Sequence, residues 1–529
     1  MQAQVVILDF GSQYTQLIAR AVREQGVYCE ILPGTAAADK VLSRNPKALI
    51  LSGGPSSVLA ADGLFADKQI LEAKLPMFGI CYGMQILAKH FGGVVTGWGR
   101  AAHAADEAQT GADESGIREF GRAEVSLASA EGPFKALGGQ KTFTAWMSHG
   151  DKITQNPPGF RTIATSEGAP ICAFGDEARK IYGVQFHVEV HHTPQGKEIL
   201  KSFLFDVAKL EKDWNPAQFA DTVIADVRAK APQGNVVCGL SGGVDSTVAA
   251  VLVHKAIGSR LHCIFVDNGL LREGERDDVE KFLKPLGLNL HIVDASRRFL
   301  DELKGVTNPE QKRKIIGRVF IDVFEEEAQR IEAVEYLVQG TLYPDVIESV
   351  SVVGQSVTIK SHHNVGGLKD VMKLKLIEPL RELFKDEVRV IGRGLKIPDK
   401  IIDRQPFPGP GLAVRCLGEI TDDKLVRLRR ADSIVREEVE RADLATVIWQ
   451  SFAVLLPIQS VGVMGDGRTY EQTIAVRAVT SVDGMTADWY MFPEEVLRRM
   501  ASRIINETPG VNRVVLDIST KPPSTIEWE

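Results

Sequence analysis

The stretch "NVVCGLSGGVDSTVAAVLVHKAI" (235–257) joins a short apolar run to a helix-length segment through a glycine-rich turn. This order predicts a strand, a loop and a helix, the building block of parallel sheets. Backbone N–H groups and hydroxyls in such a loop hold phosphate oxygens at the helix N-terminus. The loop is not a Walker A motif, because the GK[ST] residues are absent. We therefore predict a phosphate site formed by Ser241, Gly242, Gly243, Val244, Asp245, Ser246 and Thr247.

Apolar runs alternate with amphipathic segments on both sides of this loop. They include "VVILDF" (5–10), "KALILSGGP" (47–55), "PMFGICYG" (76–83) and "LHCIFVDNG" (261–269). The rhythm predicts an α/β fold of βαβ units with largely parallel sheets. Beyond residue 403 the pattern changes to that of a small α+β region, with helix-like 422–441 and 492–507 between strand-like segments.

Acidic side chains end two of the predicted strands. Asp267 ends one and Asp345 ends a later one, at the edge where doubly wound sheets bind ligands. Asp345 and Glu348 together offer the hard oxygen ligands that Mg²⁺ prefers. The alternative is that these aspartates only cap helices.

A second candidate site is centred on "GICYG" (79–83), which follows a predicted strand and opens a helix. The spacing matches a nucleophile elbow with Cys81 as the nucleophile. Flanking glycines make the tight turn possible, and the helix N-terminus favours a thiolate. The alternative is a buried structural cysteine.

His187 and Glu189 lie two residues apart in strand-like "KIYGVQFHVEV" (180–190), so we expect both side chains on one face. A histidine can act as base toward a cysteine, and a carboxylate can orient the imidazole. Two other interpretations are a surface strand with scattered polar residues, and a metal site that includes His191 and His192.

Four motifs, "LSGGP" (51–55), "GICYGMQ" (79–85), "MSHGD" (147–151) and "FHVE" (186–189), occur in the order of class I glutamine amidotransferases. The chain resembles that family. The resemblance implies Cys81 as nucleophile, His187 as base and Glu189 as orienting acid. It also implies an oxyanion hole of backbone N–H groups near Gly54 and Tyr82, and contact of Gln85 with glutamine. The chain has Val188 where the family usually has proline.

"SGGVDS" (241–246) resembles the PP-loop of N-type ATP pyrophosphatases, which release pyrophosphate and leave AMP on the substrate. The resemblance implies ATP as co-substrate, with adenosine near Asp267. The basic run "QKRKIIGR" (311–318) is either a solvated helix face or a source of phosphate counter-charge. Lys360 and Lys385 are further candidates for stabilising charge in the transition state.

The C-terminal region carries the motifs that distinguish among acceptors. "QPFPGPGLAVR" (405–415), "SVGVMGDGRTY" (460–470) and "KPPSTIEWE" (521–529) resemble those of GMP synthases. The resemblance implies xanthosine monophosphate (XMP) as acceptor and a homodimer formed by this region. The positions that match the family's XMP contacts are Arg313, Asp466, Lys521 and Glu527. Without the resemblance, the tail would be interpreted as a disordered end.

The resemblance divides the chain into three predicted domains. Residues 1–207 form an amidotransferase α/β domain, 208–403 a doubly wound PP-loop domain, and 404–529 a small α+β domain that dimerises and completes the nucleotide site. The segment 97–121, rich in Ala, Gly, Asp and Glu, is predicted to be a flexible surface loop.

Composition limits the classes of function and location. The formal net charge of −7 argues against a protein that coats nucleic acid. The six cysteines occur singly, so neither a zinc ribbon nor a disulfide scaffold is indicated. No stretch reaches the ~18 apolar residues expected of a membrane span, and the N-terminus lacks signal-peptide features. The expected location is the cytoplasm.

The resemblance implies a ligase that takes ammonia from glutamine and uses ATP to aminate XMP. Three alternatives remain open. Other amidotransferase-coupled ligases make NAD or asparagine but lack the tail motifs. PP-loop enzymes that thiolate tRNA are expected to have a basic surface and often paired cysteines. The third is a non-enzymatic nucleotide sensor or scaffold, which the intact Cys81, His187 and Glu189 set disfavours.

Overall fold

The computed structural model describes residues 2–97, 119–350, 374–464, 467–481, 484 and 486–529. Asp466, Lys360 and nearly all of the Ala-rich segment lie outside these ranges. Contacts within the chain define two compact units, Met1–Asn215 with Pro344–Gln355, and Pro216–Tyr343 with Ser356–Glu529.

The first unit is organised around a nine-stranded mixed sheet. Its first five strands are parallel and its last four join by antiparallel pairs. Almost every residue of the central strands is buried, as expected for parallel strands covered on both faces. The order across the sheet is β2 (Cys29–Pro33), β1 (Val5–Asp9), β3 (Ala48–Leu51), β4 (Met77–Ile80), β11 (Ile181–Val184), β10 (Ala173–Asp176), β9 (Arg161–Thr165), β6 (Glu119–Leu127) and β7 (Thr142–His149).

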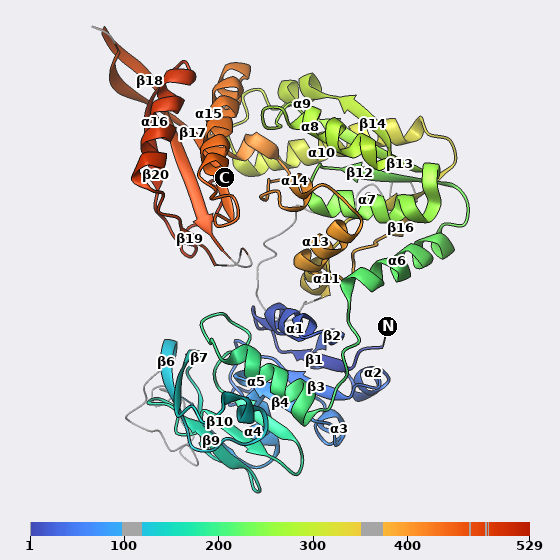
Figure 1. The fold of residues 1–529 in the computed structure, drawn as a ribbon, viewed down its shortest axis with the longest axis vertical. Coiled ribbons are helices and arrows are strands. Elements are labelled where there is room, and N and C mark those ends of the chain that lie inside the picture. Colours follow the sequence, from blue (N-terminus) through green and yellow to red (C-terminus); the bar gives the residue numbers. More distant parts are fainter. Residues whose placement is uncertain (1, 98–118, 351–373, 465–466, 482–483, 485) are drawn as a thin grey trace. The chain divides into compact units, whose positions relative to one another are not determined.

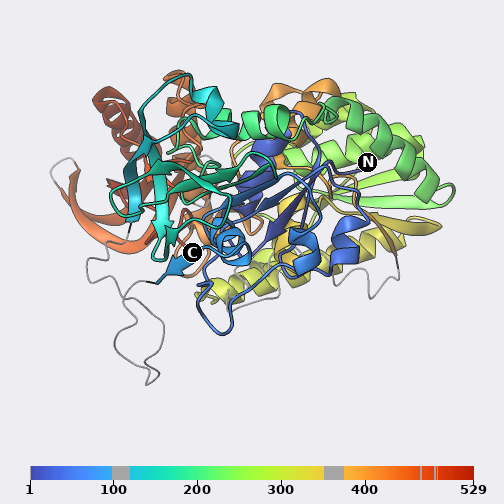
Figure 2. The same cartoon turned by 90° about the horizontal axis from the view of Figure 1, so that it is seen from below.

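Short helices cover this sheet (Figures 1 and 2). Helix α1 (Thr15–Glu24) buries Ile18, Ala19 and Val22, the spacing that places apolar residues on one helical face. The remaining elements are α2 (Ala38–Leu42), α3 (Lys68–Leu71), α4 (Tyr82–His90), η1 (Gly132–Leu137), α5 (Gly196–Ser202), η2 (Phe203–Val207), α11 (Tyr343–Val350) and the paired strands β5 (Val94–Thr96) and β8 (Lys152–Gln155).

The second unit contains a five-stranded sheet in which every pairing is parallel. Helices α6, α7 and α13 contact one another, and α10 contacts α9 and β13. The strand order is β14 (Asn289–Asp294), β13 (Leu261–Asp267), β12 (Asn235–Leu240), β15 (Val334–Val338) and β16 (Lys375–Ile377). The helices are α6 (Pro216–Lys230), α7 (Val244–Ile257), η3 (Gly258–Arg260), α8 (Glu275–Leu283), η4 (Lys284–Leu286), α9 (Ser296–Glu302), α10 (Pro309–Gln329), α13 (Lys385–Gly394) and α14 (Asp399–Ile402).

The C-terminal part of this unit adds a smaller sheet with two helices, as the sequence predicts. Strands β17 and β18 form a long antiparallel pair, and β20 joins β18 in parallel. Helix α15 contacts both β17 and α16. The elements are η5 (Gly411–Val414), α15 (Asp422–Arg441), β17 (Gln450–Met464), β18 (Gly467–Thr480), β19 (Asp488–Trp489), α16 (Glu494–Glu507) and β20 (Val511–Asp517).

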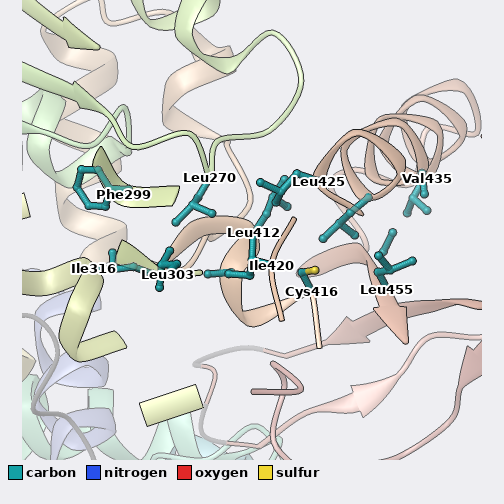
Figure 3. Packing of buried hydrophobic residues seen from close by; sticks show 14 of the residues in the cluster. Leu270, Phe299, Leu303, Ile316, Leu412, Cys416, Ile420, Leu425, Val435 and Leu455 are labelled. Carbon is teal, nitrogen blue, oxygen red and sulfur yellow. The ribbon is translucent and has the colours of Figure 1, made fainter. Parts of the chain in front are cut away.

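One apolar cluster runs through both parts of the second unit. Figure 3 shows Leu270, Phe299 and Leu303 beside Leu412 and Cys416. Gly411 has φ +61° and approaches so closely that a Cβ there would lie 2.4 Å from the Leu270 carbonyl oxygen. Because the core is continuous here, the predicted boundary at 403/404 coincides with no gap in packing, and it stays a prediction.

Candidate functional sites

Cys81 occupies a strained turn between β4 and α4. Its backbone has φ 51° and ψ −106°, a conformation that residues with a side chain rarely adopt. A Cβ at Gly79 would lie 2.7 Å from backbone atoms of Gly83, and one at Gly83 would lie 2.3 Å from the Leu51 carbonyl oxygen. Both flanking glycines are therefore sterically required, as the predicted elbow demands.

The other parts of this site follow neighbouring strands. Cys81 follows β4, the 51–55 loop follows β3, and His187 follows β11. These three strands are adjacent and parallel, so their carboxyl ends meet at one edge of the sheet. A Cβ at Gly54 would lie 3.2 Å from Tyr82 Cδ1, which places the two predicted oxyanion-hole residues side by side.

The predicted strand over 180–190 is wrong beyond Val184, where β11 ends. His187 makes an isolated bridge with Trp146, and the chain bends on either side of it. The expected pair nevertheless forms, because the bend brings His187 Nδ1 to 2.6 Å from Glu189 Oε1. Both side chains are almost fully buried.

His187 also interacts with the Cys81 side chain, which contributes to the shift of its pKa. Burial alone would lower the pKa of His187, but the Glu189 carboxylate and Cys81 raise it well above its usual value. The raised pKa favours an imidazolium at His187, placed where it can protonate a leaving group next to Cys81.

The remaining cysteines do not share this environment. Burial raises the pKa of Cys238 to about 12 and that of Cys416 to about 11. The pKa values of Cys172 and Cys263 are also raised by burial. These thiols stay protonated at neutral pH, which leaves them without a nucleophilic role.

The glycine-rich loop lies at the carboxyl end of β12, where α7 begins. The Ser246 and Thr247 hydroxyls donate to the Gly243 carbonyl oxygen, at 3.2 and 2.8 Å. The Ser241 N–H group donates to Ser246 Oγ at 3.3 Å. Lys385 Nζ, on α13, lies 3.6 Å from Asp245 Oδ2. Hydroxyls, a helix N-terminus and a lysine thus converge where a polyphosphate would bind.

Asp267 ends the neighbouring strand β13, as the sequence predicts. Its Oδ1 accepts from the Gly269 N–H group at 3.0 Å, and Oδ2 lies 3.7 Å from Arg276 Nη1. The loop and Asp267 therefore follow adjacent parallel strands of one sheet.

The tail is ordered, unlike the disordered end that the sequence suggests without the family resemblance. The fully buried guanidinium of Arg477 donates to the carbonyl oxygens of Ser519, Thr525 and Ile526, at 2.6, 3.1 and 3.4 Å. A buried cation needs such acceptors, and here the tail supplies them.

The Glu527 carboxylate is held by two buried side chains. Arg415 donates to it from Nε at 3.1 Å and from Nη2 at 2.9 Å, and Gln450 Nε2 donates at 2.8 Å. Arg415 is fully buried, and its guanidinium lies 4.0 Å from the centroid of the Phe452 ring.

Comparisons with known proteins agree with this organisation. The models described as "Glutamine amidotransferase class-I", "NAD synthase" and "GMP synthase C terminal domain" match residues 6–207, 217–314 and 437–528. Proteins named "GMP synthase [glutamine-hydrolyzing]" from Chlorobium chlorochromatii and Chlorobaculum tepidum are 56% and 55% identical, over 99% of both chains. A third, from Solidesulfovibrio magneticus, is 55% identical over the same share. The chain belongs to the glutamine-hydrolysing GMP synthase family.

In this member of the GMP synthase family, Cys81, His187 and Glu189 come together as predicted. Gln85 is buried nearby, where its Nε2 donates to the Asp151 carbonyl oxygen at 3.1 Å. Ser241 to Thr247 span the turn after β12 and the first turn of α7, and hydrogen bonds within the segment join its two parts. The fold predictions for the three regions of a GMP synthase are confirmed.

The predicted XMP contacts are less closely grouped. Arg313 pairs with Glu310 on α10 at 2.7 Å, and the neighbouring Lys312 is fully buried against Glu529 at 2.6 Å. Lys521 Nζ donates to the Gly484 carbonyl oxygen at 2.7 Å. The Lys312–Glu529 ion pair thus joins α10 to the tail. Arg313 is next to Lys312 on the helix, and Glu527 lies two residues before Glu529 in the tail.

Sequence reasoning did not single out Gln185, Arg415 or Gln450. Gln185 is fully buried, and its Nε2 lies 3.6 Å from Cys81 Sγ. It lies two residues before His187, so its place beside a motif was the available signal. Arg415 is the last residue of the motif at 405–415, so its place in that motif was the available signal. Gln450 lies outside every quoted motif and gave no such signal.

Asp345, with Glu348, was predicted to hold Mg²⁺. The prediction that Asp345 ends a strand is wrong, because β15 ends at Val338 and Asp345 lies in the first turn of α11. Asp345 belongs to the first unit and the glycine-rich loop to the second. Within the described residues, no three His, Cys, Asp or Glu side chains form a group that could bind a metal ion. A search of the same residues for helices with the length and hydropathy of a membrane span finds none. The Mg²⁺ ligands stay a prediction.

Proposed function

We propose that the chain makes GMP from XMP, with glutamine as nitrogen source and ATP as activator. The observation that carries the proposal is an intact nucleophile site and an intact phosphate loop in a chain whose full-length relatives are named GMP synthases. The test is to supply glutamine, Mg-ATP and XMP and to measure GMP, AMP and pyrophosphate together. Equal amounts of the three products are expected, and ATP cleavage without GMP would overturn the choice of acceptor.

The first half-reaction is proposed to be glutamine hydrolysis by Cys81. The thiolate attacks the carboxamide carbon, while N–H groups near Gly54 and Tyr82 stabilise the oxyanion. The His187 imidazolium gives its proton to the departing ammonia, leaving a thioester. Water, deprotonated by His187, then releases glutamate and regenerates the thiol. Gln185 is proposed to keep Sγ oriented through its contact at 3.6 Å.

The second half-reaction is proposed to take place over residues 241–247. The C2 oxygen of XMP attacks the α-phosphorus of ATP, and pyrophosphate leaves. Ammonia then attacks C2, and AMP leaves to give GMP. Loop N–H groups, hydroxyls and Lys385 balance the phosphate charge. Asp267 is proposed to contact adenosine, and Arg313, Asp466, Lys521 and Glu527 to contact XMP.

The residues of the loop fit a divalent cation. Asp245 Oδ1 is buried and has no hydrogen-bond partner within the described structure, a costly state for a carboxylate oxygen. Mg²⁺ bound with ATP would supply charge neutralisation on the phosphates. Asp245 is therefore proposed as a Mg²⁺ ligand, and Asp345 and Glu348 stay the ligands that the sequence predicts.

The cysteines support the cytoplasm as the proposed compartment. All six side chains are buried and none forms a disulfide, which is the usual state in a reducing compartment.

We expect Glu189→Gln to shift the pH dependence of glutaminase activity. Loss of the carboxylate removes an interaction that raises the pKa of His187, so the imidazolium that protonates ammonia is lost at lower pH. The basic limb of kcat/KM should move to lower pH, and the maximum should fall by roughly 10²-fold. The measurement is glutamate release across pH.

Glu119→Gln is the matched control, because Glu119 lies 3.2 Å from His149 in another buried pair of the same unit. It should leave the position of the basic limb unchanged. An unmoved limb in Glu189→Gln would contradict the assigned role of Glu189.

A homodimer through the C-terminal sheet is also proposed. Val461 and Val463 on β17, and Tyr470 on β18, are more than half exposed, and Val461 lies directly opposite Tyr470. Such an apolar patch on a long antiparallel pair is typical of a protein interface. The occupant proposed is the same surface of a second copy.

Val461→Asp combined with Val463→Asp should therefore give a monomer in sedimentation velocity, because desolvated carboxylates would face each other across the interface. Val426→Asp, at an equally exposed valine on α15, should remain dimeric. A wild-type monomer, or a dimer that survives the double substitution, would refute this interface.

A further inference from the structure

A guanidinium from outside the phosphate loop holds the loop's backbone. Arg404 Nη1 donates to the Gly242 carbonyl oxygen at 2.9 Å, although the two residues are far apart in the sequence. Gly242 has φ +72°, and a Cβ there would lie 2.8 Å from a methyl of Val279 and 3.2 Å from Arg404 Nη1. Glycine at 242 thus allows Arg404 to reach the main chain.

The hydrogen bond that fixes the Gly242 carbonyl group also fixes the direction of the Gly243 N–H group. The Gly242 carbonyl and the Gly243 N–H group belong to one planar trans peptide, so they point in opposite directions. The Gly243 carbonyl is likewise occupied, by the Ser246 and Thr247 hydroxyls. With both carbonyl oxygens engaged inside the protein, the N–H side of the turn faces away from them. The Gly243 N–H group donates to Ser241 Oγ at 3.3 Å, a long hydrogen bond that a bound phosphate oxygen would replace or share.

Arg404 is itself anchored by a buried carboxylate. Its Nη2 contacts Glu275 Oε1, and the Glu275 side chain is 4% exposed. The other oxygen, Oε2, accepts from the Arg272 N–H group at 2.9 Å just before α8. The guanidinium is therefore held between α8 and the loop, with little freedom to rotate.

The segment that carries Arg404 is docked on the C-terminal sheet. Gln405 Oε1 accepts from the Ser451 N–H group at 2.9 Å, and its Nε2 donates to the Ile448 carbonyl oxygen at 3.1 Å. Gln450, between these two positions, binds Glu527. A short series of contacts thus connects the tail with the Gly242–Gly243 peptide.

We propose that Arg404 is a positioning residue that sets the Gly242–Gly243 peptide for ATP binding. The inference rests on the proposed role of residues 241–247 as the phosphate-binding loop. Arg404 acts through the Gly242 carbonyl and its docking on the C-terminal sheet, and it does not contact the nucleotide.

The test measures ATP binding by calorimetry and the KM for ATP in ammonium-dependent GMP synthesis. Arg404→Met should weaken ATP binding and raise the KM by on the order of tenfold, the effect of losing a hydrogen bond from a charged donor. Arg404→Lys should restore part of the affinity, since one ammonium can still reach the carbonyl. Arg393→Met is the control. Arg393 pairs at 2.5 Å with Asp403, the residue before Arg404, and this ion pair lies on the surface.

Glu275→Gln separates positioning from direct phosphate contact. Its amide can still accept from the Arg272 N–H group but no longer holds Arg404 by charge. If Arg404 positions the loop, releasing it weakens ATP binding. If Arg404 contacts phosphate, releasing it from a carboxylate strengthens ATP binding, and the proposal is overturned.

Three other outcomes bear on this inference and on the proposed function. ATP affinity within twofold of wild type in Arg404→Met would overturn the inference, even if the protein makes GMP. If wild type binds ATP but makes no GMP, the proposed acceptor fails while the binding series still tests Arg404. If wild type does not bind ATP, the loop assignment and this inference both fail.

Discussion

With alanine in place of Cys81, the protein should make no GMP from glutamine yet retain synthesis from ammonium salts. The elbow places the Cys81 thiol where it interacts with His187, which is itself paired with the Glu189 carboxylate. Removal of a covalent nucleophile typically lowers turnover by 10⁴-fold or more. Glutamine-dependent GMP formation should therefore fall below detection, while the ammonium-dependent rate changes less than about twofold. The measurement is initial rates with each nitrogen source.

Cys172→Ala is the matched control, since Cys172 is a buried thiol of the same unit with a pKa raised by burial. It should keep its glutamine-dependent rate per folded molecule. Glutamine-dependent synthesis that survives in Cys81→Ala would exclude the thioester route. Loss of both activities would instead indicate that the substitution disrupts the fold.

Among the single substitutions proposed in the second unit, Arg415→Met should lower the free energy of unfolding most. Arg415 is fully buried, pairs with Glu527 through two nitrogens and lies 3.6 Å from the buried Asp432. Breaking a buried pair leaves an uncompensated charge, which costs about 3–5 kcal/mol. Asp432 keeps Arg272 and Arg436 within 3.4 Å, so the lower end of that range is expected. The measurement is urea unfolding of the second unit.

Arg498→Met is the control, because Arg498 pairs with Glu494 on the open surface of α16. Exposed ion pairs contribute little, so its unfolding curve should overlie that of wild type. Arg415→Lys keeps the charge but not the two-nitrogen geometry, and should fall between the two. Equal stability of Arg415→Met and Arg498→Met would disprove the role assigned to this network.

The sequence predicted well those features that depend on local pattern. The glycine-rich loop and the cysteine elbow each require glycine at fixed positions, and apolar runs of strand length set their place at strand ends. His187 and Glu189 were paired correctly although the strand that carried the argument ends at Val184. Motif spacing was a better guide there than the period of a strand.

The sequence could not predict features that depend on distant residues. Arg477 orders the tail by binding three of its carbonyl groups, which a short run with two prolines does not reveal. Arg404 and Gly242 meet only in the folded chain. The role of a buried arginine of this kind follows from its hydrogen-bond acceptors. Tertiary packing decides which residues supply those acceptors.

The meeting of β3, β4 and β11 at one edge of a sheet has an evolutionary consequence. The loops after these strands bring Gly54, Cys81 and His187 together within one compact unit, since all three residues belong to Met1–Asn215. Such a unit carries its own catalytic residues when it is joined to another domain. Recombination can join the unit to a domain for another acceptor and leave the nucleophile site unchanged. The choice of product then evolves separately, in the domain to which the unit is fused.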